Sequence, residues 1–178
     1  MEPNAPVAVR LAQIANSIAF ATWAGTTDQR LQALSTYLSA VRETVGMEVA
    51  FVSQLVDQWR VFKVVSASPQ THAPIRVGQS DPLLDTYCMY VLQGRLPPVI
   101  RDIRTAWHHA ALLPITERLG IGCYLSATVL LTDGRPFGTL CCFSRQARPD
   151  LLDEDGQALG EVARAIGAAV DESGSGSP

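Results

Sequence analysis

The sequence has few charged residues, few histidines and no long apolar run. Charged residues make up 17% of the 178 positions, with 14 Lys and Arg against 17 Asp and Glu. The basic residues are scattered, so we expect no nucleic-acid-binding patch. Polar residues interrupt every hydrophobic stretch, so we expect no membrane-spanning segment. The first residues, MEPN, lack the basic start of a secretory signal.

The cysteines are not spaced as metal ligands. Cys88, Cys123, Cys141 and Cys142 include no CxxC pair, so we expect no zinc site, and reduced thiols in a cytoplasmic protein are the simplest interpretation. The sequence also lacks a Walker-type loop and a Ser-His-Asp arrangement. With 47% hydrophobic residues, the chain can bury a sizeable core as one domain.

Three stretches repeat apolar residues with the period of a helix. Residues 7–21 carry one narrow apolar stripe, which suits packing against another helix. Residues 31–45 repeat the pattern and stop at Gly46. Residues 153–170 form the third helix, in which small residues recur at positions 156, 160, 163 and 167. Glycine is costly inside a helix, so a close helix neighbour could explain this stripe; a helix without a partner there is the alternative.

Between these helices the period changes to two. Residues 47–56 and 59–67 predict one hairpin, and residues 122–131 and 137–144 predict another around the turn Asp133-Gly134. Asp81-Pro82 predicts the start of a central helix, which Gly94 would end, before a short strand at 98–100. This order predicts an α+β fold with a central antiparallel sheet. The outer helices would cover one face, and short helices and loops would form a pocket on the other.

Four segments together resemble bacterial GAF domains. They are residues 85–94 (DTYCMYVLQG) with 100–102 (IRD), residues 119–126 (LGIGCYLS), residues 133–143 (DGRPFGTLCCF) and residues 152–155 (LDED). The likeness covers roughly residues 26–171. The sequence is most similar to the GAF modules that are linked to cyclic-di-GMP enzymes, histidine kinases or phosphatases. It implies a PAS-related sheet of about six strands, a ligand pocket, and often dimerisation through the outer helices.

The resemblance also divides the chain. We expect residues 1–25 to be an N-terminal helix that can serve in dimerisation, residues 26–171 to be the GAF domain, and residues 172–178 to be a flexible Ser/Gly tail. The expected function is that of a bacterial sensory module rather than an enzyme. It would bind an unidentified small molecule, form a homodimer, and act on a fused or separate output domain, without nucleic acid or membrane.

The implied pocket lies between the sheet and the central helix. The residues expected to line it are Phe51, Tyr87, Cys88, Val91, Asp102, Trp107, Tyr124, Ser126 and Thr128. Tyr124, Ser126 and Thr128 alternate along one strand and could equally form its solvent face. Asp102 could touch the ligand or cap a turn at Thr105.

The cofactor is not fixed by the sequence. Covalent bilin attachment is not expected, because Cys88 is followed by Met89 where bilin-binding relatives have a Cys-His pair. Haem or a noncovalent tetrapyrrole is an alternative, and haem would use His108 or His109 as its axial ligand. A thiol-dependent reductase of free methionine sulfoxide is the enzymatic alternative, with Cys123 and Cys141 approaching across the second hairpin.

Overall fold

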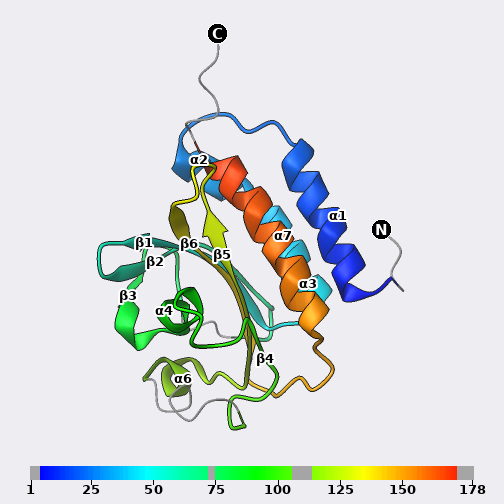
Figure 1. The fold of residues 1–178 in the computed structure, drawn as a ribbon, viewed down its shortest axis with the longest axis vertical. Helices are drawn as coiled ribbons and strands as arrows, with labels where there is room; N and C mark the ends of the chain where they lie inside the picture. The colour runs from blue at the N-terminus through cyan, green and yellow to red at the C-terminus, as the bar shows by residue number, and fades with distance from the viewer. Residues whose placement is uncertain (1–4, 72–74, 106–113, 172–178) are drawn as a thin grey trace.

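Figure 1 shows a curved antiparallel sheet with helices on both faces. The computed structural model describes residues 5–71, 75–105 and 114–171. Six strands lie in the order β3-β2-β1-β6-β5-β4, and each adjacent pair is antiparallel. The strands are β1 (Val49–Val56), β2 (Trp59–Ala67), β3 (Ser80–Pro82), β4 (Val99–Ile100), β5 (Cys123–Leu130) and β6 (Pro136–Ser144). The predicted α+β class and sheet are confirmed.

The helices divide between the two faces of the sheet. They are α1 (Val7–Phe20), α2 (Thr27–Ala33), α3 (Ser35–Val45), the 3-10 turn η1 (Leu83–Asp85), α4 (Tyr87–Leu92), α6 (Pro114–Leu119) and α7 (Asp153–Val170). Helices α3 and α7 pack on one face, and α1 packs alongside α7 as an outer layer (Figure 1). The shorter α4 and α6 lie on the opposite face (Figure 1). No helix in the described ranges combines the length and apolarity needed to cross a bilayer.

Both predicted hairpins are present because their turns carry the right residues. Asp57 adopts a φ of 53° between β1 and β2, and Gly134 adopts a φ of 85° between β5 and β6. Asp and Gly tolerate this left-handed region better than other residues do. Strands β1 and β6, one from each hairpin, then pair at the centre of the sheet, so the two hairpins form one continuous surface.

The apolar stripe of α1 is buried within its own chain. Leu11, Ile14 and Ile18 are almost fully covered and belong to the core between the helical layer and the sheet. The stripe therefore packs against helices, as its narrowness indicates, and the helices are α7 and α3 of the same chain.

The glycines of α7 mark close approaches to strands rather than to a helix. A Cβ atom added at Gly167 would lie 1.9 Å from the carbonyl oxygen of Leu130 in β5, and one at Gly156 would lie 2.6 Å from Val99 Cγ2 in β4. At Gly160 nothing lies within 4 Å of an added Cβ. The expectation of a close helix neighbour is therefore wrong for Gly156 and Gly167. At these two positions the missing side chain allows α7 to pack directly against β4 and β5.

The central helix begins later than predicted. Residues 80–82 form β3, which pairs with β2 by placing Asp81 opposite Arg60 and Pro82 opposite Trp59. Proline is accepted here because β3 is an edge strand. The segment continues through η1, and α4 starts only at Tyr87. Asp81-Pro82 resembles a helix start in sequence, but the cross-strand partner on β2 decides its conformation.

The contact of Gly167 with β5 gives a stability prediction. Gly167→Ala should lower the free energy of unfolding by about 2 kcal/mol or more, because a methyl group would collide with the backbone of Leu130. Gly160→Ala in the same helix should leave stability unchanged or raise it by up to about 1 kcal/mol. Urea denaturation of both variants measures the difference, and equal effects would show that Gly167 makes no special contact.

Candidate functional site

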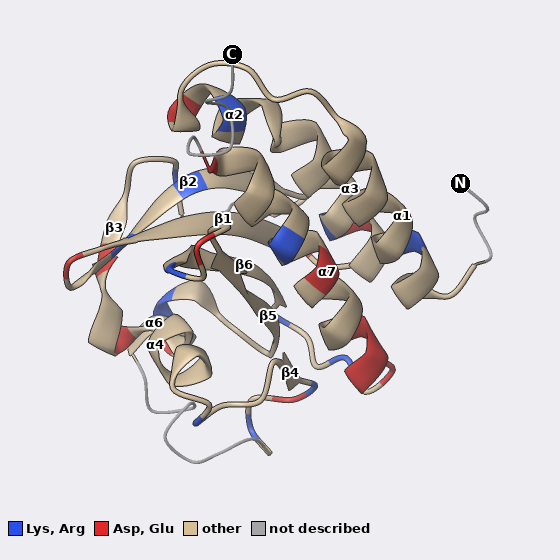
Figure 2. Cartoon of the chain, turned by 45° about the horizontal axis from the view of Figure 1, so that its top comes forward, with Lys and Arg blue, Asp and Glu red and all other residues tan. Residues whose placement is uncertain are grey.

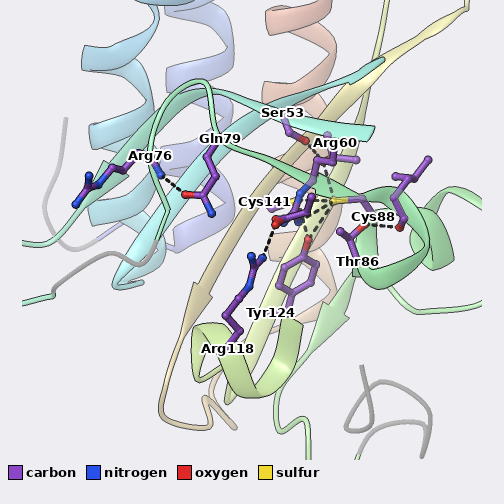
Figure 3. Close-up of polar contacts among 12 residues, drawn as sticks. Ser53, Arg60, Arg76, Gln79, Thr86, Cys88, Arg118, Tyr124 and Cys141 are labelled. Carbon is purple, nitrogen blue, oxygen red and sulfur yellow. Dashed lines mark hydrogen bonds and ion pairs between the residues drawn. The ribbon is translucent and has the colours of Figure 1, made fainter. Parts of the chain in front are cut away.

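A cluster of polar side chains is buried between α4 and the sheet (Figure 3). We call it the Arg60–Cys88 cluster; its members are Arg60, Asp81, Cys88, Tyr124, Thr139 and Cys141. They come from β2, β3, α4, β5 and β6, and all are at most 2% exposed. Burying several polar groups in one core is costly unless they bond to one another. The hydrogen bonds and ion pairs within the cluster therefore explain how these groups are tolerated there.

Arg60 occupies the centre of this cluster. Its guanidinium carbon lies 4.5 Å from the centroid of the Phe62 ring and 5.3 Å from that of Phe51, so two aromatic faces support the buried charge. One terminal nitrogen, Nη2, forms an ion pair with Asp81, and the other, Nη1, donates to Cys88 Sγ at 3.6 Å. The Nε atom is buried and has no hydrogen-bond partner in the described part of the chain.

Asp81 joins the buried charge to the surface. Its second carboxylate oxygen accepts a hydrogen bond of 2.6 Å from Arg118 of α6, and the side chain of Arg118 is 45% exposed. Figure 3 shows Arg118 reaching toward the cluster from below. The carboxylate thus bridges two guanidinium groups, and β3 and α6 are both tied to β2 by charge.

Two of the four cysteines meet in the cluster. Cys88 Sγ lies 4.0 Å from Cys141 Sγ and 3.1 Å from Thr139 Oγ1. Tyr124 donates its hydroxyl to Cys141 Sγ at 2.9 Å, and Thr139 is bonded on its other side to Ser53 at 2.8 Å. No disulfide is formed; all four cysteines are free and buried.

The surroundings of the two thiols shift their pKa values in opposite directions. The hydrogen bond from Cys141, the charge of Arg60 and the hydroxyl of Thr139 lower the pKa of Cys88 well below its usual value, against the effect of burial. Burial raises the pKa of Cys141 well above its usual value, and the nearby Cys88 raises it further. Burial also raises the pKa of Tyr124, so this phenol remains a hydrogen-bond donor.

The expected approach of Cys123 and Cys141 is wrong. In the β5–β6 register Cys123 pairs with Ser144, whereas Cys141 pairs with Ser126. Cys123 then lies in the core under the helices, and Cys141 lies in the core under α4. Adjacent residues of a strand face opposite sides, so Cys141 and Cys142 diverge, as the sequence indicates.

An open cleft lies beside the cluster at the edge of β5. Its volume is about 560 Å³, within the range of small-molecule sites. We call it the α4–β5 cleft; it is lined by Val91, Gly94, Arg95, Leu96, Pro97, Pro98, Ser126, Ala127, Thr128 and Gly156. The cleft exists because β4 is only two residues long and pairs only with Tyr124 and Leu125, which leaves the rest of that edge uncovered by a strand.

The predicted pocket residues divide between these two places. Val91, Ser126 and Thr128 line the α4–β5 cleft. Phe51, Tyr87, Cys88 and Tyr124 are instead enclosed in the core beneath α4. They pack against one another there, with the Tyr87 and Tyr124 ring centroids 4.8 Å apart.

The last two predicted residues do not join either place. Asp102 forms an ion pair with Arg104 at 2.8 Å, and its carbonyl oxygen accepts a hydrogen bond from Thr105, which is a turn contact. Asp102 lines a separate surface hollow of about 370 Å³. Trp107 lies outside the described residues, as do His108 and His109, the two haem ligands expected from the sequence.

Arg60, Asp81 and Thr139 are the site residues that sequence reasoning missed. One signal was present: Arg60 alternates with Phe62 and Val64, which are buried apolar positions of the same strand. Among the described residues no group of His, Cys, Asp and Glu could hold a metal ion. Figure 2 shows acidic residues gathered at the start of α7, with Lys and Arg dispersed over the other elements.

The buried ion pair gives a second stability prediction. Asp81→Asn should lower the free energy of unfolding by about 3 kcal/mol or more, because it weakens the compensation of a buried guanidinium. Asp133→Asn is the matched control, since Asp133 pairs with Arg135 at the surface, and exposed ion pairs contribute little to stability because water and salt screen them. Denaturant unfolding measures both, and equal losses would contradict the role given to Asp81.

Several solved structures share this fold. The chain resembles the phycocyanobilin-bound GAF domain of a cyanobacterial phytochrome, with 12% identity, a TM-score of 0.68, and coverage of 92% of this chain and 93% of that one. It resembles a putative GAF sensor protein from Burkholderia vietnamiensis, with 15% identity, a TM-score of 0.65 and 90% coverage of both chains.

A third relative in structure is an enzyme. The free methionine-R-sulfoxide reductase of Neisseria meningitidis, in complex with its substrate, has 16% identity and a TM-score of 0.62, covering 89% of this chain and 84% of that one. At such identities the likeness shows the fold alone. No curated protein matches the sequence, but the GAF domain family matches it over residues 29–170. The chain therefore belongs to the GAF domain family.

Proposed function

We propose that this chain is a sensory GAF domain that binds a small molecule in the α4–β5 cleft and passes the change to its outer helices. The observation that carries the proposal is the position of Gly156. This residue belongs to the first turn of α7 and lines the cleft together with Val91 of α4. A ligand there would touch elements from both faces of the sheet.

The packing of α7 provides a route from the cleft to the surface. Helix α7 lies against β5 so closely at Gly167 that a methyl group would not fit, and α1 packs along α7. A close-packed helix shifts as a unit rather than deforming gradually. Displacement of its first turn by a ligand would therefore move α7 and α1 together.

The lining of the cleft limits the ligand. Its described lining contains apolar groups from Val91, Leu96 and Pro98, a hydroxyl from Thr128, and no acidic side chain. A neutral or anionic molecule with an apolar body fits this chemistry better than a cation does. Phytochrome GAF domains with bound bilins and the substrate complex of the Neisseria reductase support the use of this fold for small molecules.

A thiol-dependent reductase is the second candidate function. The contact between Cys88 and Cys141 favours it, since such chemistry needs an attacking and a resolving sulfur. Both sulfurs are fully buried, however, whereas an enzyme must bring methionine sulfoxide to the attacking sulfur. Binding in the open cleft is therefore the better-supported proposal.

We also propose that the domain acts in the cytoplasm and controls an output domain or partner protein.

Filling the cleft should abolish ligand binding. Thr128→Trp would place a large side chain in the α4–β5 cleft, and Leu84→Trp places one at an exposed position on η1. In thermal-shift assays with cyclic nucleotides, amino-acid derivatives and tetrapyrroles, a compound that stabilises the unmodified protein should stabilise Leu84→Trp equally and Thr128→Trp hardly at all. Equal stabilisation of all three proteins would place the ligand elsewhere.

We further propose a homodimer through the outward face of α1. The apolar stripe of α1 packs against helices of the same chain. On another part of this helix, however, Phe20 is 89% and Val9 is 47% exposed. Phe20 and Val9 are eleven positions apart, or three helical turns, and so share one face.

Light scattering after chromatography should show a dimer at high micromolar concentration. Phe20→Asp should weaken this dimer at least about tenfold, because it places a charge in an apolar contact. Val77→Asp, at another exposed apolar position, should not weaken it. A monomeric unmodified protein would overturn the dimer.

A further inference from the structure

Two buried cysteines meet beneath α4. Their sulfurs lie 4.0 Å apart although they are 53 positions apart in sequence. Cys88 belongs to α4 and Cys141 to the central strand β6, so the pair bridges the interface between the helix and the sheet. The other two cysteines, Cys123 and Cys142, lie on the opposite face of the sheet, which makes them natural internal controls.

The surroundings of Cys88 favour a thiolate. The guanidinium of Arg60 is held in place by Asp81 and two aromatic rings, and its Nη1 points at Cys88 Sγ. Thr139 lies 3.1 Å from the same sulfur and can donate its hydroxyl. A positive charge and a hydroxyl donor are the groups that make a cysteine nucleophilic.

Cys141 has the complementary environment. It is fully buried, and its sulfur lies beside Cys88, to which its S–H group can donate. No cation bonds to this sulfur among the described residues, so its thiol form is favoured. The pair therefore combines one sulfur suited to attack an oxidant with a second sulfur placed to resolve the product.

The geometry also allows the pair to close. A disulfide brings its sulfurs to about 2.05 Å, so Cys88 and Cys141 must approach by about 2 Å. Strand β6 is fixed at the centre of the sheet, between β1 and β5. Helix α4 has only six residues and no side-chain hydrogen bond at its N-cap, Thr86, so it is the element that can move.

We propose that Cys88 and Cys141 form a redox-active pair that hydrogen peroxide converts to an intramolecular disulfide. The Cys88 thiolate attacks a peroxide oxygen, the O–O bond breaks, and the departing hydroxide takes up a proton to become water. Cys141 then loses its proton, its sulfur attacks the sulfenic sulfur of Cys88, and the hydroxyl group leaves as water. Hydrogen peroxide is thereby reduced and the two thiols are oxidised.

Burial sets the selectivity of this reaction. Both sulfurs are inaccessible in the reduced state, so an oxidant reaches them only when α4 moves away from the sheet. Hydrogen peroxide is small enough to enter through such an opening, whereas bulky disulfides are not. The disulfide needs no ligand in the α4–β5 cleft, so this site and the proposed binding function can succeed or fail separately.

The test is oxidation of the reduced full chain with hydrogen peroxide, followed by unfolding, alkylation of the free thiols and peptide mass spectrometry. Two of the four thiols should escape alkylation, and one linked peptide should join Cys88 to Cys141. Cys123→Ser and Cys142→Ser should form the same link. Cys141→Ser should instead accumulate a sulfenic acid at Cys88 that dimedone traps. A link between other cysteines, or four free thiols after exposure to excess peroxide, would overturn the proposal.

A matched pair of hydroxyl variants tests the positioning of the thiolate. Thr139→Val keeps the shape of the side chain but removes its hydrogen bond to Cys88, and it should slow disulfide formation about tenfold. Ser53→Ala removes the other partner of Thr139 and should leave the rate within about twofold. The thiolate absorbance near 240 nm reports ionisation directly: Cys88→Ser should lose the step that titrates at lowest pH, and Cys142→Ser should retain it. Equal rates for both hydroxyl variants would contradict this assignment.

Discussion

A positive charge buried beneath a short helix organises one whole side of this molecule. The guanidinium of Arg60 is 2% exposed, and such a charge is tolerated only where partners replace the lost water. Those partners come from β3 and α4, and α6 is linked to the charge through Asp81. Asp81 fixes β3 against β2, Arg118 ties α6 to Asp81, and Cys88 brings α4 against the sheet. Without the charge, these short elements would keep their apolar core but lose the polar contacts that tie them to β2.

The two faces of the sheet consequently differ in physical character. The helical face is dominated by aliphatic side chains and by close backbone contacts between α7 and β5. The α4 face carries aromatic rings, thiols, hydroxyls and an ion pair. The first arrangement gives rigidity, because close packing resists gradual deformation. The packing of the α4 face depends on the protonation and oxidation states of its side chains, so a change in either state would alter that packing.

Local patterns predicted most of the fold, because they are carried by neighbouring residues. The turn at Asp133-Gly134, the two hairpins and the apolar stripe of α1 all follow from spacing over a few positions. The predicted start of the central helix at Asp81 was wrong. Asp81-Pro82 satisfies the local rules for a helix start, but its conformation depends on Arg60, twenty-one positions earlier. The contact of Cys88 with Cys141 was missed for the same reason. Long-range pairs such as these depend on strand register, which one sequence does not display.

The short strand β4 has a consequence for how such a domain can diversify. It pairs with β5 through Val99 and Ile100 only, and the loop of residues 93–98 precedes it at the edge of the sheet. Residues of this loop form one wall of the α4–β5 cleft, yet they belong to no strand or helix. Insertions and substitutions there would reshape the cleft without disturbing the register of the central strands or the seat of α7. Under the proposed function, recognition would lie mainly in this loop and transmission in α7, so selection could alter one while preserving the other.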